Sequence, residues 1–242
     1  TASAPTTCHK IEGNNFLKST QEQSIDFKTL TQGLTPKARA SFSSTDKITL
    51  EDLKNPTGKL SLEGLSKFSY DSIIRITDTE ISDIRNMNIL SYIIHRLGNK
   101  VILSVGDAYV DDEGVLNMTD VTIPENLKHL VLEDKKGKVK VIGDDFLSKP
   151  ADDEEEYDDY DGCSSLTTVS FEGFNNTTGI RNFFLNESRS LRAINLEAFK
   201  NVTSIGDYFL NDCKRLSNEK KKEIEVEILK RGKENKELTL KN

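Results

Sequence analysis

Several residue types are scarce in this chain of 242 residues, which has no tryptophan, three cysteines and three histidines. Only 35% of the residues are hydrophobic, which is little for a compact globule but suits an elongated protein with a large surface. No stretch approaches the roughly 18 consecutive apolar residues of a membrane-spanning helix. The net charge of −7 argues against general nucleic-acid binding, which needs a basic surface. We therefore expect no membrane span and no nucleic-acid partner.

The few cysteines, Cys8, Cys163 and Cys213, do not form a disulfide framework. Cys163, Ser188 and Cys213 follow one another at equal steps along the chain (188 − 163 and 213 − 188), so stacked repeats would place the two cysteines two layers apart. At strand spacing this is roughly 9–10 Å, which exceeds the ~7 Å between Cα atoms that a disulfide tolerates. We expect Cys163 and Cys213 to be small buried residues. The cysteines therefore do not indicate in which cellular compartment the protein lies.

Residues typical of catalysis are scattered along the chain. The histidines stand at positions 9, 95 and 129, and there is no nucleophile elbow, phosphate loop or pair of metal ligands. His95 has no Cys, His or carboxylate at ligand spacing, so we interpret it as structural or solvated. The sequence predicts no catalytic residue, no metal site and no cofactor. The alternative is an enzyme whose site lies before residue 105 and is assembled only by folding.

A constant step of 25 positions (205 − 180 and 216 − 191) relates two stretches within residues 179–216. The motif Ile180-Arg-Asn-Phe-Phe-Leu returns as Ile205-Gly-Asp-Tyr-Phe-Leu, and Leu191 returns as Leu216. Units with such a period cannot bury their apolar face alone and stack on their neighbours. The sequence therefore predicts an α/β repeat solenoid, which presents an extended surface to a partner.

A shorter pattern of apolar and polar residues indicates one strand in each repeat. It reads Ile25-Asp-Phe-Lys-Thr-Leu and, 23 positions later (48 − 25), Ile48-Thr-Leu-Glu-Asp-Leu. Alternation over three to five positions followed by a turn is typical of a short strand. The next copy begins at Leu60, and the step from Leu50 to Leu62 is only 12 positions (62 − 50). We therefore expect the N-terminal repeats to be irregular.

Residues 82–97 break this rhythm and predict a helix. Ile84, Met87, Leu90, Ile94 and Leu97 fall on one face at helical spacing, with a serine or aspartate before them and a glycine after them. We expect this amphipathic helix to pack on the N-terminal region. A strand over residues 101–105 and a turn over residues 111–114 follow.

The regular repeats contain an acidic insertion. Between Lys149 and Cys163 the repeat spacing is too long, and the excess equals the length of the segment 150–162. The carboxylates of this segment repel one another, so we expect it to stay extended. Three interpretations remain open: a solubilising loop, electrostatic recognition of a basic patch on a partner, or calcium binding without EF-hand spacing. The candidate binding residues are Asp152, Asp153, Glu154, Glu155, Glu156, Tyr157, Asp158, Asp159, Tyr160 and Asp161.

Three motifs in the regular part point to a family. They are Val121-Thr-Ile-Pro-Glu-Asn, Cys163-Ser-Ser-Leu-Thr-Thr-Val and Ile205-Gly-Asp-Tyr-Phe-Leu-Asn-Asp-Cys. They resemble the BspA-type leucine-rich repeats of surface proteins from bacteria and some protists, over residues 115–216 and more weakly over residues 25–105. The resemblance implies a right-handed superhelix with a parallel sheet on its concave face, and a role in adhesion or host-protein recognition.

The face of that sheet is the second candidate site. In each strand the residue between two apolar positions points outward, and small polar residues predominate there. Contact with solvent alone and a broad protein contact both fit this composition. The outward residues are Asp26, Thr49, Ser61, Thr122, Val131, Ser170 and Asn195, of which Thr122, Val131, Ser170 and Asn195 are the candidate contacts.

The C-terminal stretch changes character at Ser217. Residues 218–231 predict a charged helix with a narrow apolar seam at Ile224, Ile228 and Leu229, ended by Gly232. Residues 237–240 could add a last strand. Terminal repeats of a solenoid need a cap with a polar outer face, and this segment supplies one.

The predicted organisation has four parts: a flexible leader (1–20), an irregular N-terminal repeat region with one amphipathic helix (21–114), regular leucine-rich repeats with the acidic insertion (115–216), and a C-terminal cap (217–242). We predict a non-enzymatic protein-binding module of BspA-like type, at the cell surface or secreted, with a role in adhesion or host interaction. An effector scaffold of the same fold, secreted or intracellular, is the alternative. The partner is a protein that could carry a basic patch.

Overall fold

In the computed structural model the described residues are 24–28, 73–97, 100–119, 121, 123–124, 127–148 and 165–241. Several predictions fall outside them: the leader (1–20), the acidic segment (150–162), and the residues Cys8, Thr49, Ser61, Thr122 and Cys163. The described strands form parallel sheets that are accompanied by helices, so the protein has an α/β fold.

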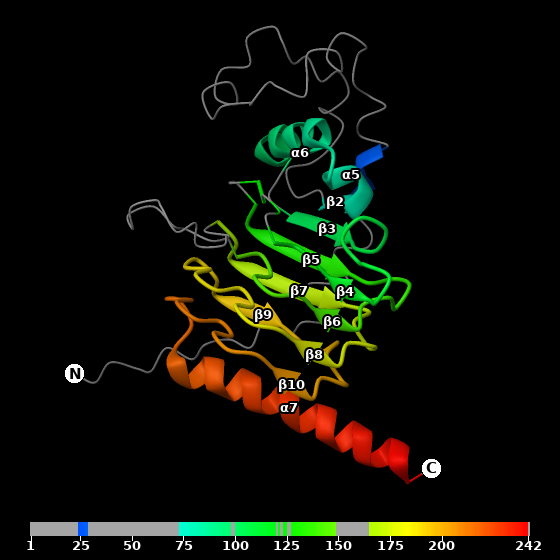
Figure 1. Ribbon diagram of the computed structural model, residues 1–242. Coiled ribbons are helices and arrows are strands. Elements are labelled where there is room, and N and C mark those ends of the chain that lie inside the picture. The colour runs from blue at the N-terminus through cyan, green and yellow to red at the C-terminus, as the bar shows by residue number, and fades with distance from the viewer. Residues whose placement is uncertain are drawn as a thin grey trace, which may run out of the picture.

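Six parallel strands form the larger sheet (Figure 1). They lie side by side in chain order, and the short strands that lie between them in the sequence belong to a second sheet. The six strands are β1 (Ser24–Asp26), β2 (Ile73–Thr77), β3 (Lys100–Ser104), β5 (His129–Glu133), β7 (Thr168–Glu172) and β9 (Ala193–Asn195). The predicted strand at residues 101–105 is β3, one residue earlier than expected. Alternating and short apolar runs bounded by turns explain why these segments pair as strands.

Four two-residue strands form a second parallel sheet, in the order β10–β8–β6–β4. They are β4 (Val115–Leu116), β6 (Val141–Ile142), β8 (Gly179–Ile180) and β10 (Ser204–Ile205). From β3 onward the chain alternates between the two sheets. Paired residues of β8 and β10 are 25 positions apart (204 − 179), whereas those of β6 and β8 are 38 apart (179 − 141). The difference of 13 equals the length of the segment 150–162.

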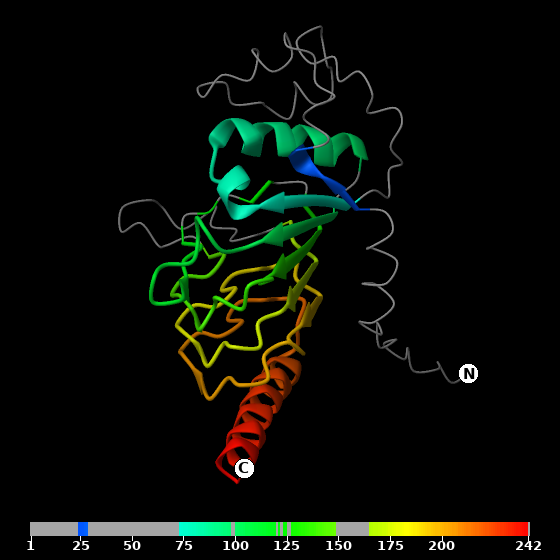
Figure 2. The same ribbon diagram turned by 90° about the vertical axis from the view of Figure 1, so that its right-hand side faces the viewer.

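Two helices lie at the β2 end of the larger sheet (Figure 2). The first, α5 (Asp78–Ile81), is a single turn that follows β2 and begins with a capping box between Thr77 and Glu80. The second, α6 (Ile84–Leu97), is the predicted amphipathic helix, and it buries Met87, Leu90 and Ile94. Ile84 was expected on the buried face but is 52% exposed, because Ile89 and Ile93 are buried instead and the apolar face is centred later in the helix.

At the opposite end, α7 (Asn218–Leu240) runs past the last strands (Figure 1). Ser217 is its N-cap, and the Ser217 hydroxyl accepts a hydrogen bond from Lys220 N at 3.1 Å. The predicted helix end at Gly232 and the predicted strand at residues 237–240 are wrong, since the helix continues to Leu240. Gly232 is buried, and a Cβ there would meet the Val202 carbonyl oxygen. This glycine permits close packing of α7 on the chain rather than ending the helix.

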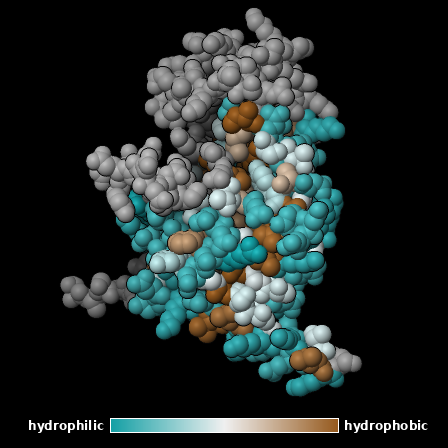
Figure 3. Space-filling view, in the orientation of Figure 1, coloured by the Kyte–Doolittle hydropathy of each residue, from teal (hydrophilic) through white to brown (hydrophobic). Residues whose placement is uncertain are grey.

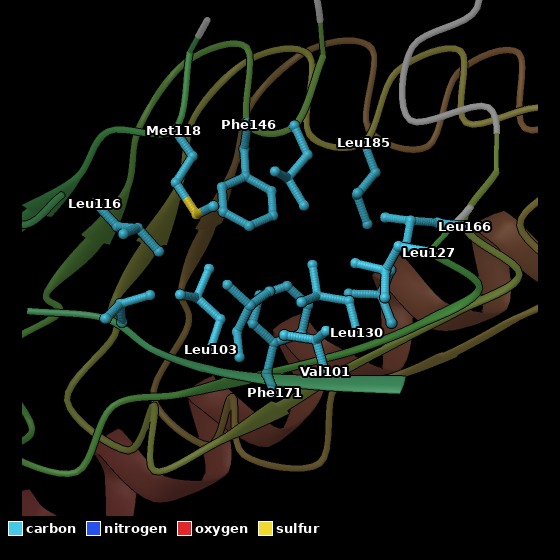
Figure 4. Close-up of a cluster of buried hydrophobic side chains, with 14 of the residues drawn as sticks. Val101, Leu103, Leu116, Met118, Leu127, Leu130, Phe146, Leu166, Phe171 and Leu185 are labelled. Atoms are coloured by element: carbon cyan, nitrogen blue, oxygen red, sulfur yellow. The ribbon is translucent and has the colours of Figure 1, made fainter. Parts of the chain in front are cut away.

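The core lies between the two sheets and extends to both helical ends. Figure 4 shows Leu116, Met118 and Phe146 facing Val101, Leu103 and Phe171 across this space. Rings join successive layers: Phe146 stacks on Phe184 at 5.2 Å between centroids, and Phe184 on Phe209 at 5.3 Å. One cluster of buried residues runs from Phe27 and the α6 side chains to Ile228 of α7. The described part therefore shares one core.

Cys213 is a buried core residue, as predicted. Its thiol donates a hydrogen bond to Leu185 O at 3.2 Å, and burial raises the pKa of the thiol to about 11. Ser188, one repeat step earlier in the chain, is also fully buried, and its hydroxyl has no hydrogen-bonding partner among the described residues. The thiol is therefore neutral at physiological pH, and its role is packing.

No helix within the described ranges is long and apolar enough to cross a membrane.

Candidate binding surface on the larger sheet

The outward face of the larger sheet is formed by every second residue of its strands. The residues in between, such as Leu130, Leu132 and Phe171, belong to the core. Strand register therefore sets which side chains lie side by side on the outward face. A central row crosses the whole sheet and consists of Asp26, Arg75, Ile102, Val131, Ser170 and Asn195.

Three of the four predicted contact residues, Val131, Ser170 and Asn195, are consecutive members of this row on β5, β7 and β9. The fourth, Thr122, lies outside the described residues. The predicted outward residue Asp26 is exposed at the far end of the row. The register thus brings together side chains that are up to 169 positions apart in the chain (195 − 26).

Apolar side chains on this face form a second small cluster, separate from the core. Its members Ile73, Ile102 and Val131 are only 4%, 4% and 3% exposed. Val131 points outward as predicted, but it is buried, which corrects its prediction as an open contact residue. The sequences of β3 and β5 each hold three apolar residues in a row, which is typical of strands covered on both faces.

An ion pair crosses this cluster. Arg75 Nη1 of β2 lies 2.9 Å from Glu133 Oε2 of β5, and β3 runs between these two strands. Two strand spacings amount to roughly 10 Å, so the arginine side chain extends across β3 to reach Glu133. The same glutamate oxygen accepts a hydrogen bond from the Ser104 hydroxyl at 3.0 Å. Lys135 Nζ approaches it at 3.4 Å.

Glu172 of β7 stands beside Glu133 in the register. Its side chain is half-buried, and among the described residues its carboxylate has no hydrogen bond or ion pair. Burial first, and then the neighbouring Glu133 carboxylate, raise the pKa of Glu172, while Arg75 lowers it. The face therefore holds a carboxylate whose charge is incompletely balanced.

The other edge of the face is occupied by a row made of Lys100, His129, Thr168 and Ala193. His129 Nδ1 and the Thr168 hydroxyl lie 2.7 Å apart. Burial, and then the charges of Lys100 and Lys128, lower the pKa of His129. This histidine is therefore neutral at physiological pH and serves as a hydrogen-bonding group of the face.

Side chains on the outward face are more buried on β3 and β5 than on β7 and β9. The central residues of β3 and β5 are buried, whereas Ser170, Glu172 and Asn195 are half-buried and polar. Asn195 Oδ1 accepts a hydrogen bond from Glu197 N at 2.9 Å, which fixes its orientation. We call Ser170, Glu172 and Asn195 the open patch. Among the described residues, no side-chain hydrogen bond or ion pair joins the open patch to another element.

The sequence prediction missed Arg75, Ile102, Glu133 and Glu172. The triple apolar runs of β3 and β5 were a usable signal for buried residues on both faces. The ion pair gave no local signal, because Arg75 and Glu133 are 58 positions apart. The predicted acidic site at residues 152–161 lies outside the described part, and within that part no group of three or more His, Cys, Asp and Glu could hold a metal ion.

The described surface in the view of Figure 3 is mainly hydrophilic, with hydrophobic patches separated by polar side chains. Comparisons of the chain with models of protein families, with curated proteins and with solved structures gave no significant match.

Proposed function

We propose that this chain is a non-enzymatic protein-binding module whose partner contacts the open patch on the larger sheet. The proposal rests mainly on the Glu172 carboxylate. This group is half-buried and lies beside Glu133, and no described residue forms an ion pair or hydrogen bond with it. A basic side chain of a partner would balance the charge of the Glu172 carboxylate. Ser170 and Asn195 supply neutral hydrogen-bonding groups around it, which suits a broad protein contact.

The proposed architecture is a solenoid of leucine-rich-repeat type. Three observations support it: the chain alternates between two parallel sheets, paired residues of β8 and β10 are 25 positions apart (204 − 179), and α7 covers the last strands. Each layer contacts its neighbours through paired strands and stacked rings. The motif resemblance to BspA-type repeats agrees with this arrangement and supports a role in adhesion or host interaction, at a cell surface or after secretion.

Affinity capture from host-cell and matrix extracts tests the proposal. We expect a protein partner that binds the intact chain at low salt and binds less at moderate salt, since charge contributes to the contact. Replacement of Glu172 by arginine should lower the affinity at least roughly tenfold. Retention of the partner by the Glu172→Arg variant would contradict the proposed site.

Deletion of residues 150–162 is the second arm of that experiment. The open patch is intact in this variant, so the proposal predicts that the partner stays bound. Loss of the partner on deletion, together with retention by Glu172→Arg, would move the site to the acidic segment.

A further inference from the structure

Three segments that follow the short strands share an unusual backbone. We call residues 143–148, 181–188 and 206–213 the first, second and third corner. At matching positions they hold non-glycine residues in the left-handed region, with φ between 51° and 60°. Such a backbone is strained for most side chains and persists where neighbouring contacts stabilise it. The residues are Asp145, Phe183 and Tyr208, then Leu147, Leu185 and Leu210, then Glu187 and Asp212.

Each corner is hydrogen-bonded to the next in the same way. Asp145 N donates to Asn182 O at 3.1 Å, and Phe183 N donates to Asp207 O at 2.9 Å. In the other direction, Leu185 N donates to Phe146 O and Leu210 N donates to Phe184 O, both at 3.0 Å. The first and second corners are therefore joined by the same backbone hydrogen bonds as the second and third corners.

Side chains repeat the pattern. Asp144 Oδ1 accepts a hydrogen bond from Asn182 N at 3.1 Å, and Asn182 Oδ1 accepts one from Asp207 N at 2.9 Å. The rings of Phe183 and Tyr208 stack with centroids 4.7 Å apart and planes 3° from parallel. The third corner therefore meets an amide oxygen and an aromatic ring of the second corner.

The third corner has the same groups, but no fourth corner packs against it among the described residues. Tyr208 N and the carbonyl oxygens of Ile205 and Phe209 match atoms that are bonded in the second corner, and none has a partner among the described residues. The same holds for the carboxylate of Asp207. Tyr208 is 58% exposed although Phe183 covers one face of its ring. The exposed edge therefore offers backbone hydrogen-bonding groups and an aromatic ring to one further segment.

A groove borders this edge. It has a volume of about 500 Å³ and lies between the third corner and the first turns of α7. Tyr208 and Asn211 line one side, and Lys221, Lys222 and Glu225 line the other. The space suits a short extended segment, and its helical wall offers charged groups to the polar side chains of such a segment.

We propose that this groove binds an extended peptide segment that carries an aromatic side chain. The segment adds backbone hydrogen bonds to Tyr208 N and to the carbonyl oxygens of Ile205 and Phe209, and its ring stacks on Tyr208. The third corner makes this same contact with the second, so the groove continues an interface that already exists within the chain. Addition of a segment to an open edge is a common mode of peptide recognition. The groove and the open patch share no residue, so the experiment on one site does not decide the other.

A synthetic peptide with the sequence of residues 205–212 is the probe, because this sequence binds the equivalent surface of the second corner. Titration of the full chain, followed by amide chemical shifts in NMR, should give saturable changes at residues 205–212 and in the first turns of α7. A peptide with serine in place of its tyrosine and phenylalanine should bind roughly two- to tenfold more weakly. Equal binding of the two peptides, or no saturable change at the third corner, would overturn the proposal.

Three variants separate binding from folding. Tyr208→Asn removes the ring and keeps a residue that tolerates a left-handed backbone, so we expect a roughly two- to tenfold loss of affinity. Tyr208→Phe keeps the ring and should bind as the parent chain does. Val226→Ser removes another exposed apolar side chain, 56% exposed on α7 and outside the groove, and should change nothing. A loss of affinity in Val226→Ser equal to that in Tyr208→Asn would contradict the proposed site.

Discussion

The two faces of the larger sheet are built from alternate residues of the same strands, yet they differ in kind. On the inner face Phe171 contacts the rings of Phe174 and Phe199, with centroids 5.2 and 4.9 Å away. On the outer face its neighbour Ser170 lies in the polar open patch. The inner face holds the layers together through continuous packing, whereas the outer face combines a small apolar cluster with ionic groups. We therefore expect that stability and the proposed recognition can be altered separately.

Phe171→Ala should have the largest effect, because it removes a side chain that contacts four other rings. We expect the free energy of unfolding to fall by about 3–5 kcal/mol. Urea unfolding followed by circular dichroism measures this loss. The adjacent Ser170→Ala is the matched control, and its change should stay within about 0.5 kcal/mol. Equal losses in the two variants would show that the faces do not differ as described.

Gly232→Ala should be the next most disruptive change, because α7 closes the inner face at the last strands. The added Cβ would meet the backbone of Val202, with its carbonyl carbon 2.6 Å away. Alanine is the better helix former, so local propensity alone predicts stabilisation. We expect overpacking to prevail and to lower the free energy of unfolding by about 1–3 kcal/mol. The exposed neighbour Lys233→Ala should be nearly neutral, and a stabilised Gly232→Ala would contradict the close packing of α7.

Arg75→Met tests the ionic part of the outer face. The change leaves Glu133 and Glu172 side by side without the arginine, in a partly buried setting. The expected loss at pH 7 is about 1–2 kcal/mol, between the values for exposed and buried pairs. The loss should shrink at acidic pH, because protonation of Glu172, whose pKa is raised, removes a negative charge that the arginine balances. A loss that does not depend on pH would mean that the arginine acts through packing alone.

Glu172→Gln should have the smallest effect and the opposite sign. Because the folded state raises the pKa of Glu172, ionisation of this group opposes folding, and its unfavourable contribution grows as the pH rises above 4.5. Since the side chain is half-exposed, we expect stabilisation of less than about 1 kcal/mol at pH 7. The gain should disappear below pH 4. Thermal unfolding at the two pH values measures it, and destabilisation at pH 7 would show that Glu172 has a stabilising partner.

Local signals in the sequence predicted much of the fold. The amphipathic pattern over residues 82–97 became α6, and the predicted strands around Val131 and Ser170 became β5 and β7. These predictions succeeded because helix and strand periods are set by neighbouring residues. The helix end at Gly232 failed because the local rule for glycine competes with a contact to Val202, 30 positions away (232 − 202).

The candidate site was predicted only in part. The rule of alternation found Val131, Ser170 and Asn195, since the direction of a side chain depends only on its place in the strand. The burial of Val131 and the bridge from Arg75 to Glu133 depend on which strands are neighbours, and a single sequence does not give that register. Glu172 stood out only when Glu133 was placed beside it.

The open patch is best tested with a double variant that carries both Ser170→Arg and Asn195→Arg. Its control adds one arginine elsewhere, at the exposed Thr178. Each protein is assayed for its unfolding midpoint and for its affinity for the captured partner. We expect the double variant to fold with nearly the parent midpoint and to lose the partner, whereas Thr178→Arg should retain both. If the double variant binds as the parent does, or if Thr178→Arg loses the partner as well, the open patch is not the binding surface.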